Sequence, residues 1–192
     1  ALRHVLEPIF ERDFAEQSYG FRPNRGCKDA LGRVDQLLKG GYTWVVDADL
    51  KSYFDTIPHD QLLERVREKV SDGRVLELLE AYLTQKVMET TKSWTPEGGT
   101  PQGAVISPLL SNLYLHPLDQ QMAQQGSEMV RYADDFVILC RSQGEAEAVL
   151  EQVRQWAEQA GLQLHPVKTR IVDATERGGF DFLGYHFERG MK

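Results

Sequence analysis

The chain has 192 residues, of which 41% are hydrophobic and 27% charged, so it can bury a substantial core and is not expected to be disordered. Its net charge of −7 argues against a simple nucleic-acid coat protein, which should be basic, but constrains less an enzyme that uses a local groove and metal ions. No apolar run approaches the roughly 18–20 residues of a membrane span. The two cysteines, Cys27 and Cys140, favour a reducing cytoplasm over a disulfide framework.

The first part of the chain predicts helices around one buried strand. Apolar residues over 1–17 form a helical stripe that Pro8 interrupts, and a loop over 18–30 precedes a helix that ends at Gly40. Residues 43–50, with the sequence TWVVDADL, predict a buried strand that ends in acidic residues.

The rest of the chain mixes strands and helices irregularly, with hairpins, which predicts the α+β class rather than a doubly wound sheet. In order, the expected segments are a helix from about Pro58, a helix over about 73–85, an irregular Gly- and Pro-rich stretch at 95–103, a helix with Ser107 as N-cap and Pro108 in first position, a hairpin at 128–140, a capped helix from Ser142 to Gly161, a strand-like stretch at 162–172 and an alternating segment at 180–187.

Acidic residues follow the ends of two of these strands, in DADLKSYFD (47–55) and in YADD (132–135). Two strands of one sheet could bring Asp49, Asp134 and Asp135 to a common point. Such a cluster repels itself unless a cation neutralises it, and Mg²⁺ prefers oxygen ligands. A pair of such ions forms the clamp used in phosphoryl transfer. Adjacent aspartates are also common in surface turns, so these residues alone leave both interpretations open.

Further blocks of sequence resemble, in order, the motifs of bacterial group II intron-type reverse transcriptases. They are SYGFRPNRG, DADLKSYFDTIPH (metal-binding motif A), GTPQGAVISPLLSNLYLHPLD (motif B), YADDFVILC (motif C), GLQLHPVKTRIV (motif D) and FDFLGYHF (primer grip). These blocks cover about residues 18–187. The motif B segment favours the group II type over retron and diversity-generating relatives.

The resemblance implies a polymerase palm, with an antiparallel sheet backed by helices around a ferredoxin/RRM-like core. Residues 1–42 would form part of the fingers and 43–192 the palm, with a helical insertion on the fingers side at about 58–100. The first fingers block and the helical thumb of the family are absent from this sequence, which suggests a fragment of a longer protein. Their basic residues would offset the acidic balance of this part.

By the resemblance, Asp49 and Asp134 are the principal ligands of two Mg²⁺ ions, which Mn²⁺ can replace. Asp135 would be the third carboxylate, and Leu50 would offer its backbone carbonyl. Asp47 is the rival ligand within motif A, although its spacing to the aromatic pair that follows disfavours it.

The resemblance also implies residues that contact the incoming nucleotide. Phe54 occupies the position of the steric gate, an aromatic ring that would clash with a ribose 2′-OH, and ordinary core packing is the alternative. Gln102 and Gly103 would contact the dNTP and the template, since glycine permits close backbone approach. Lys168 occupies the motif D position proposed to protonate the leaving pyrophosphate, or is an exposed lysine at a strand edge.

Nucleic-acid contacts are expected from a basic loop and from residues near the primer end. The loop would contact template or primer phosphates and supply local positive charge, with a solvated loop face as the alternative. The residues concerned are Arg22, Arg25 and Lys28 in the loop, and Tyr132, Leu183 and Gly184 near the primer end.

The predicted activity is therefore RNA-templated DNA synthesis by a cytoplasmic bacterial enzyme. Its expected partners are an RNA template, a DNA primer, dNTPs and intron RNA, with no membrane. An RNA-binding maturase that assists splicing without polymerisation is the alternative, although such a protein need not keep a costly acidic cluster. A palm-fold nucleotide cyclase would need a Gly-Gly-acidic hairpin in place of YADD. The fragment alone is expected to extend primers poorly or not at all.

Overall fold

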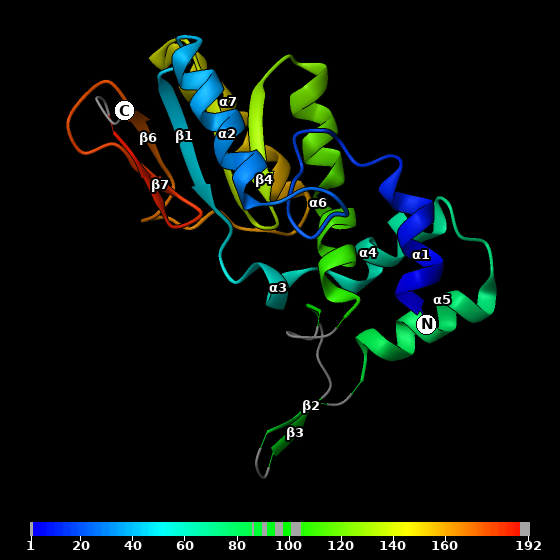
Figure 1. Cartoon of the computed structure of the whole chain (residues 1–192). Coiled ribbons are helices and arrows are strands. Elements are labelled where there is room, and N and C mark those ends of the chain that lie inside the picture. The colour runs from blue at the N-terminus through cyan, green and yellow to red at the C-terminus, as the bar shows by residue number, and fades with distance from the viewer. Residues whose placement is uncertain (1, 86, 90–91, 95–97, 101–104, 189–192) are drawn as a thin grey trace.

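The centre of the fold is an antiparallel sheet of four strands (Figure 1). In spatial order these are β4 (Glu128–Tyr132), β5 (Asp135–Cys140), β1 (Trp44–Asp49) and β6 (Arg170–Asp173). The computed structural model describes residues 2–85, 87–89, 92–94, 98–100 and 105–188. Antiparallel strands backed by helices confirm the predicted α+β class.

Different layers cover the two faces of the sheet. Helices α6 (Ser107–Gln124) and α7 (Gln143–Gln159) pack on one face. Helix α2 (Cys27–Lys39) and the hairpin of β7 (Phe180–Phe182) and β8 (Tyr185–Phe187) pack on the other (Figure 1). Both faces are therefore shielded from water.

This arrangement explains why the central strands are apolar without interruption. Consecutive residues of a strand point to opposite faces. On β1, Val46 lies in the core formed with α6 and α7, whereas Val45 lies in the core formed with α2. On β5, Phe136 and Val137 divide in the same way. A sheet buried on both sides holds its strand ends in fixed positions.

A group of helices extends beyond the sheet and packs around the start of α6. Their cores include Leu6, Leu62 and Leu79, all fully buried. Residues 109–115 of α6 are all buried, because that helix lies between this group and the sheet. No helix among the described residues is both long and apolar enough to span a bilayer. The remaining elements are α1 (Leu2–Glu11), α3 (Tyr53–Thr56), α4 (His59–Arg67), α5 (Gly73–Leu83) and the paired strands β2 (Val87–Glu89) and β3 (Lys92–Trp94).

Several predicted boundaries shift in the structure. Helix α1 continues through Pro8 instead of being interrupted there. The N-cap of α6 is Ile106, so Ser107 and Pro108 are its first residues, and the Ser107 hydroxyl lies 3.1 Å from that of Tyr82. The segment at 180–187 is a hairpin rather than one strand.

The predicted strand at 162–172 is largely irregular, with a turn at 166–168, and only its end belongs to β6. His165 causes this change, because its Nδ1 accepts hydrogen bonds from the backbone N–H groups of Val167 and Lys168, both at 3.3 Å. The backbone N–H of His165 donates to the backbone carbonyl of Asp49 at 2.7 Å. The turn is thus attached to the acidic end of β1, and it brings Lys168 there.

Candidate active site

Two acidic strand ends meet at one edge of the sheet. Strands β1 and β5 pair in a register that places Asp49 opposite Asp135. Because Tyr132 pairs with Asp135, only Ala133 and Asp134 form the turn between β4 and β5. The structure thus confirms that motifs A and C lie on adjacent strands.

Burial and mutual repulsion act on these carboxyl groups. Burial raises the pKa of Asp134, and the charge of Asp49 raises it further. Burial also raises the pKa of Asp135 to about 6, with added repulsion from Asp47, Asp134 and Asp49. The carboxylates are therefore close enough to disfavour one another's charge, which is the condition under which a cation binds favourably.

Two basic side chains face this edge from the other side of β1. Lys168 Nζ lies 2.9 Å from Asp49 Oδ2, and Arg170 Nε lies 3.1 Å from Asp47 Oδ2. The hydrogen bond and charge of Asp49 raise the pKa of Lys168. Arg170 belongs to β6, whereas Lys168 lies on a turn and is 65% exposed. Asp47 therefore pairs with a residue of the neighbouring strand. Asp49 pairs instead with an exposed lysine that lies on a turn.

A hollow of about 540 Å³ opens at this edge. Its oxygen donors suit a hard cation such as Mg²⁺, and their repulsion favours one. Within the described part of the chain, however, no three acidic, histidine or cysteine side chains already form a metal site. The donor chemistry fits, while the ligand arrangement is not preformed. The hollow is lined by Asp47, Asp49, Asp135, Val167, Lys168, Arg170 and Asp181.

Comparison with known proteins agrees with this geometry. Residues 1–187 match the family described as "Reverse transcriptase (RNA-dependent DNA polymerase)". The chain belongs to the reverse transcriptase family.

Its relatives include proteins encoded by group II introns. Protein YkfC of Escherichia coli is 34% identical in an alignment 228 residues long, gaps included. The alignment covers 98% of this chain and 59% of that protein. The group II intron-encoded protein LtrA of Lactococcus lactis is 39% identical over 124 residues, 65% of this chain and 20% of that protein. Telomerase from Candida albicans shares the fold, with a TM-score of 0.71 at 15% identity over 95% of this chain and 37% of that chain. The chain thus spans less than two thirds of the length of each.

Within this reverse transcriptase chain, Leu50, predicted to offer its carbonyl to a metal ion, and Phe54, predicted to contact the nucleotide, both follow β1. Leu50 is buried and pairs with Leu164 in an isolated bridge. Phe54 is partly buried on α3 and packs edge-on against Tyr53, with ring centroids 5.5 Å apart. Gln102 and Gly103 lie outside the described residues.

The basic loop divides into residues with different environments. Arg22 is buried, its Nε pairs with Glu11 at 2.8 Å, and its Nη1 donates to the carbonyls of Ala15 and Ser18. This arginine holds the loop together through internal contacts, and the phosphate contact predicted for it stays a prediction. Lys28, predicted as part of the loop, lies in the first turn of α2 and is exposed.

Residues expected near the primer end do approach the acidic edge. Leu183 and Gly184 form the turn of the β7–β8 hairpin, and both have positive φ values, 53° and 74°. The backbone N–H of Leu183 hydrogen-bonds Asp135, which lowers the pKa of that carboxyl against the effect of burial. Tyr132 is partly buried and directly precedes the turn of Ala133 and Asp134.

Arg131 is a residue of the site that motif spacing did not identify. It is fully buried and uses all five of its N–H donors. Two of them reach Asp119, at 2.7 and 2.5 Å, and the others reach Asn112 Oδ1, the Ala133 carbonyl and Ser18 Oγ at 2.9, 2.7 and 2.8 Å. Ala133 has an unfavourable φ of 60°, so Arg131 helps to hold the turn of Ala133 and Asp134. A lone arginine in the apolar run MVRYADD is the sequence signal.

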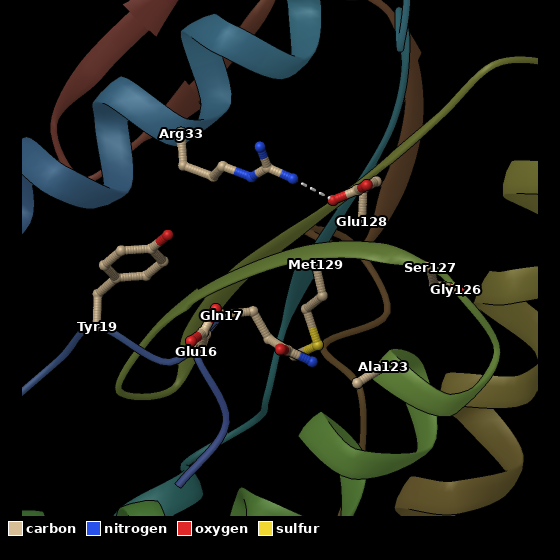
Figure 2. Close-up of a pocket in the computed structure, with 9 residues that line it drawn as sticks. All are labelled: Glu16, Gln17, Tyr19, Arg33, Ala123, Gly126, Ser127, Glu128 and Met129. Atoms are coloured by element: carbon tan, nitrogen blue, oxygen red, sulfur yellow. Dashed lines mark hydrogen bonds and ion pairs between the residues drawn. The ribbon is translucent and has the colours of Figure 1, made fainter.

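A second hollow lies at the start of β4, the end opposite the turn of Ala133 and Asp134. Figure 2 shows Arg33 reaching from α2 to Glu128, with which it forms an ion pair of 2.6 Å. Gln17 donates to the Asp119 carbonyl at 2.7 Å. These polar groups pair with one another, and this hollow of about 510 Å³ gathers no cluster of like charge comparable to the acidic edge. Its lining residues are Glu16, Gln17, Tyr19, Arg33, Ala123, Gly126, Ser127, Glu128 and Met129.

The Arg131 network predicts a large stability effect. Replacing Arg131→Met leaves the Asp119 carboxylate buried without its partner, so the free energy of unfolding should fall by about 3–5 kcal/mol. Urea unfolding followed by circular dichroism measures this change. Arg154→Ala is the matched control, because its ion pair with Glu151 has both side chains about half exposed, at 51% and 53%. The control should lose at most about 1 kcal/mol. Equal losses in both variants would contradict the role given to Arg131.

Proposed function

We propose that this chain carries the polymerase centre of an RNA-directed DNA polymerase of the group II intron type. The observation that carries the proposal is the register of β1 and β5, which sets Asp49 beside Asp135 with Asp134 in the adjoining turn. Membership of the reverse transcriptase family supports the chemistry assigned to these carboxylates.

The proposed division of the chain follows the sheet. All four strands of the central sheet lie between Trp44 and Asp173, which supports a palm over 43–192. Residues 1–42 would contribute part of the fingers, and the helices at about 58–100 would be an insertion on the fingers side.

Asp49, Asp134 and Asp135, with the backbone carbonyl of Leu50, are the groups that would hold two Mg²⁺ ions, or Mn²⁺ in their place. Such ions, when bound, supply the Lewis acidity of in-line nucleotidyl transfer from a dNTP to a primer 3′-OH. The protein contributes position, because strands packed on both faces hold the carboxylates before substrate arrives.

Lys168 is the proposed proton donor to the leaving pyrophosphate. Its ammonium lies at the acidic edge, and the hydrogen bond and charge of Asp49 raise its pKa, which keep the group protonated. Phe54 would limit the space under the sugar, and Gln102 with Gly103 would contact the nucleotide and template.

The proposed partners are an RNA template, a DNA primer, dNTPs and intron RNA. Arg25 and the exposed Lys28 would contact backbone phosphates. Tyr132, Leu183 and Gly184 would lie against the primer end, since the Leu183 N–H already reaches Asp135.

A second candidate is a maturase that assists splicing through RNA binding. Nuclear intron maturase 2 of Arabidopsis thaliana is 27% identical over 220 residues, which cover 94% of this chain. That role needs a basic RNA surface but no set of mutually repelling carboxylates. The acidic edge therefore favours the polymerase.

The polymerase proposal predicts primer extension by the natural full-length protein on an RNA template with Mg²⁺ and dNTPs. Replacing Asp134→Asn with Asp135→Asn removes two of the proposed ligand charges and should lower extension by at least about 1,000-fold, an effect on the scale of a lost metal site. Gel analysis of extended primers measures it.

Asp35→Asn is the matched control, because Asp35 is an exposed carboxylate on α2 that pairs with Lys39 in the same helix. It should extend like the unchanged protein. Equal extension by the double variant would place the metal site elsewhere. Failure of the unchanged protein to extend, with intron RNA still bound, would favour the maturase.

The role of Lys168 predicts a change in rate without a change in affinity. Lys168→Ala should lower the single-turnover rate by about 100-fold, because a positioned proton donor contributes about that much. Lys168→Arg should not restore the rate, since a guanidinium stays protonated. Rapid-quench kinetics with saturating template and primer measure both variants.

Lys39→Ala is the control, because Lys39 is 75% exposed and lies on α2 away from the acidic edge. Its rate should be unchanged. Full activity of Lys168→Arg would show that Lys168 supplies only positive charge, which would contradict the proton-donor role.

A further inference from the structure

Phe21 is a large apolar residue displayed on the surface in a strained conformation. The residue is 49% exposed, and its φ is 58°, a region that side chains with a Cβ rarely adopt. Its ring centroid lies 6.1 Å from that of Tyr132, which directly precedes the catalytic turn. Strain of this kind persists only where the surroundings enforce it, and it is concentrated at functional sites.

The residues before Phe21 attach it to the sheet and to α6. The Gly20 carbonyl accepts a hydrogen bond of 2.7 Å from Asn112 Nδ2. The Tyr19 N–H donates to the carbonyl of Arg131 at 2.8 Å. Both anchoring residues belong to the buried network that also holds the catalytic turn.

The residue after Phe21 attaches it to the preceding segment. The buried Arg22 guanidinium donates to the carbonyls of Ala15 and Ser18 at 2.6 and 2.8 Å, and pairs with Glu11. Phe21 therefore stands between two fixed neighbours, which force it outward.

The loop also packs directly against the catalytic turn. A Cβ added at Gly20 would lie 2.4 Å from the backbone nitrogen of Ala133, so only glycine permits this contact. The position of Phe21 is thus fixed relative to Asp134, at the place where the proposed reaction occurs.

We propose that Phe21 and Tyr132 form an aromatic platform that packs against the minor groove of an RNA–DNA hybrid beside the primer end. The proposal rests on the polymerase function given above. Bases in a duplex stack on one another, so the rings would meet sugars and base edges, which a wide and shallow A-form minor groove exposes. Arg25 and Lys28 follow on the same segment and supply positive charge for the adjoining phosphates. This combination suits a nucleic acid better than an apolar protein surface.

An apolar contact and a phosphate contact differ in their dependence on salt. Each phosphate contact releases counterions and adds about one unit to the slope of log affinity against log salt concentration. Packing of a ring against sugars releases none. Loss of Phe21 should therefore weaken binding equally at every salt concentration.

The test measures binding of a fluorescent RNA–DNA hybrid with a recessed primer to the natural full-length protein, by anisotropy at several salt concentrations. Phe21→Ala should weaken binding about tenfold, because the variant loses the apolar area that the ring buries in the groove, with an unchanged salt slope. Phe21→Trp should retain the affinity. Lys28→Ala is the contrasting variant, with a slope smaller by about one unit. Urea unfolding of each variant checks that the fold is retained.

Unchanged affinity of Phe21→Ala would overturn the platform, as would a change in its salt slope, which would show that the loop had lost phosphate contacts instead. Loss of affinity for single-stranded RNA but not for the hybrid would also overturn it. Binding needs no catalysis, so a protein that fails to extend primers but loses hybrid affinity on Phe21→Ala would refute the polymerase proposal and retain the platform.

Discussion

Burying a guanidinium is unfavourable unless every donor finds a partner, and Arg131 meets this condition by joining segments that are far apart in the sequence. Its partners Asp119 and Asn112 come from α6, Ser18 from the loop before α2, and Ala133 from the turn between β4 and β5. Because one side chain binds all of these groups, no one of them can move without leaving a buried charge incompletely paired. The position of the turn of Ala133 and Asp134 is thus determined by the interior of the protein as well as by its own short hairpin.

The same rigidity keeps like charges together at the edge of the sheet. Asp47 has a strand residue, Arg170, as its partner, and its side chain is only 19% exposed. Asp49 is paired with Lys168, whose side chain is 65% exposed and lies on a turn. An exposed lysine pair contributes little stability and can be exchanged for another cation at small cost. This difference, and not the spacing alone, favours Asp49 over Asp47 as a ligand.

The sequence predicted the central strands and the meeting of Asp49 with the YADD turn, because the motifs fall on apolar segments long enough to define strands. It did not predict environments that depend on tertiary contacts. The turn after His165 arises from a side chain that accepts hydrogen bonds from nearby backbone groups, and the strand pattern there was misleading. Arg22 and Lys28 look alike in a basic loop, yet one is buried and the other exposed. Periodicity cannot distinguish them.

The acidic balance of the chain bears on how a nucleic acid could be held. A net charge of −7 leaves little general attraction for phosphates, and the burial of Arg22 removes one more cation from the surface. The proposed function therefore requires short-range contacts near the primer end. The exposed ring of Phe21 and the turn at Leu183 are suited to this, since neither carries charge, the ring lies next to Tyr132, and the turn lies close to Asp135. Contacts of this kind, with sugars and the shape of a groove, do not depend on base sequence.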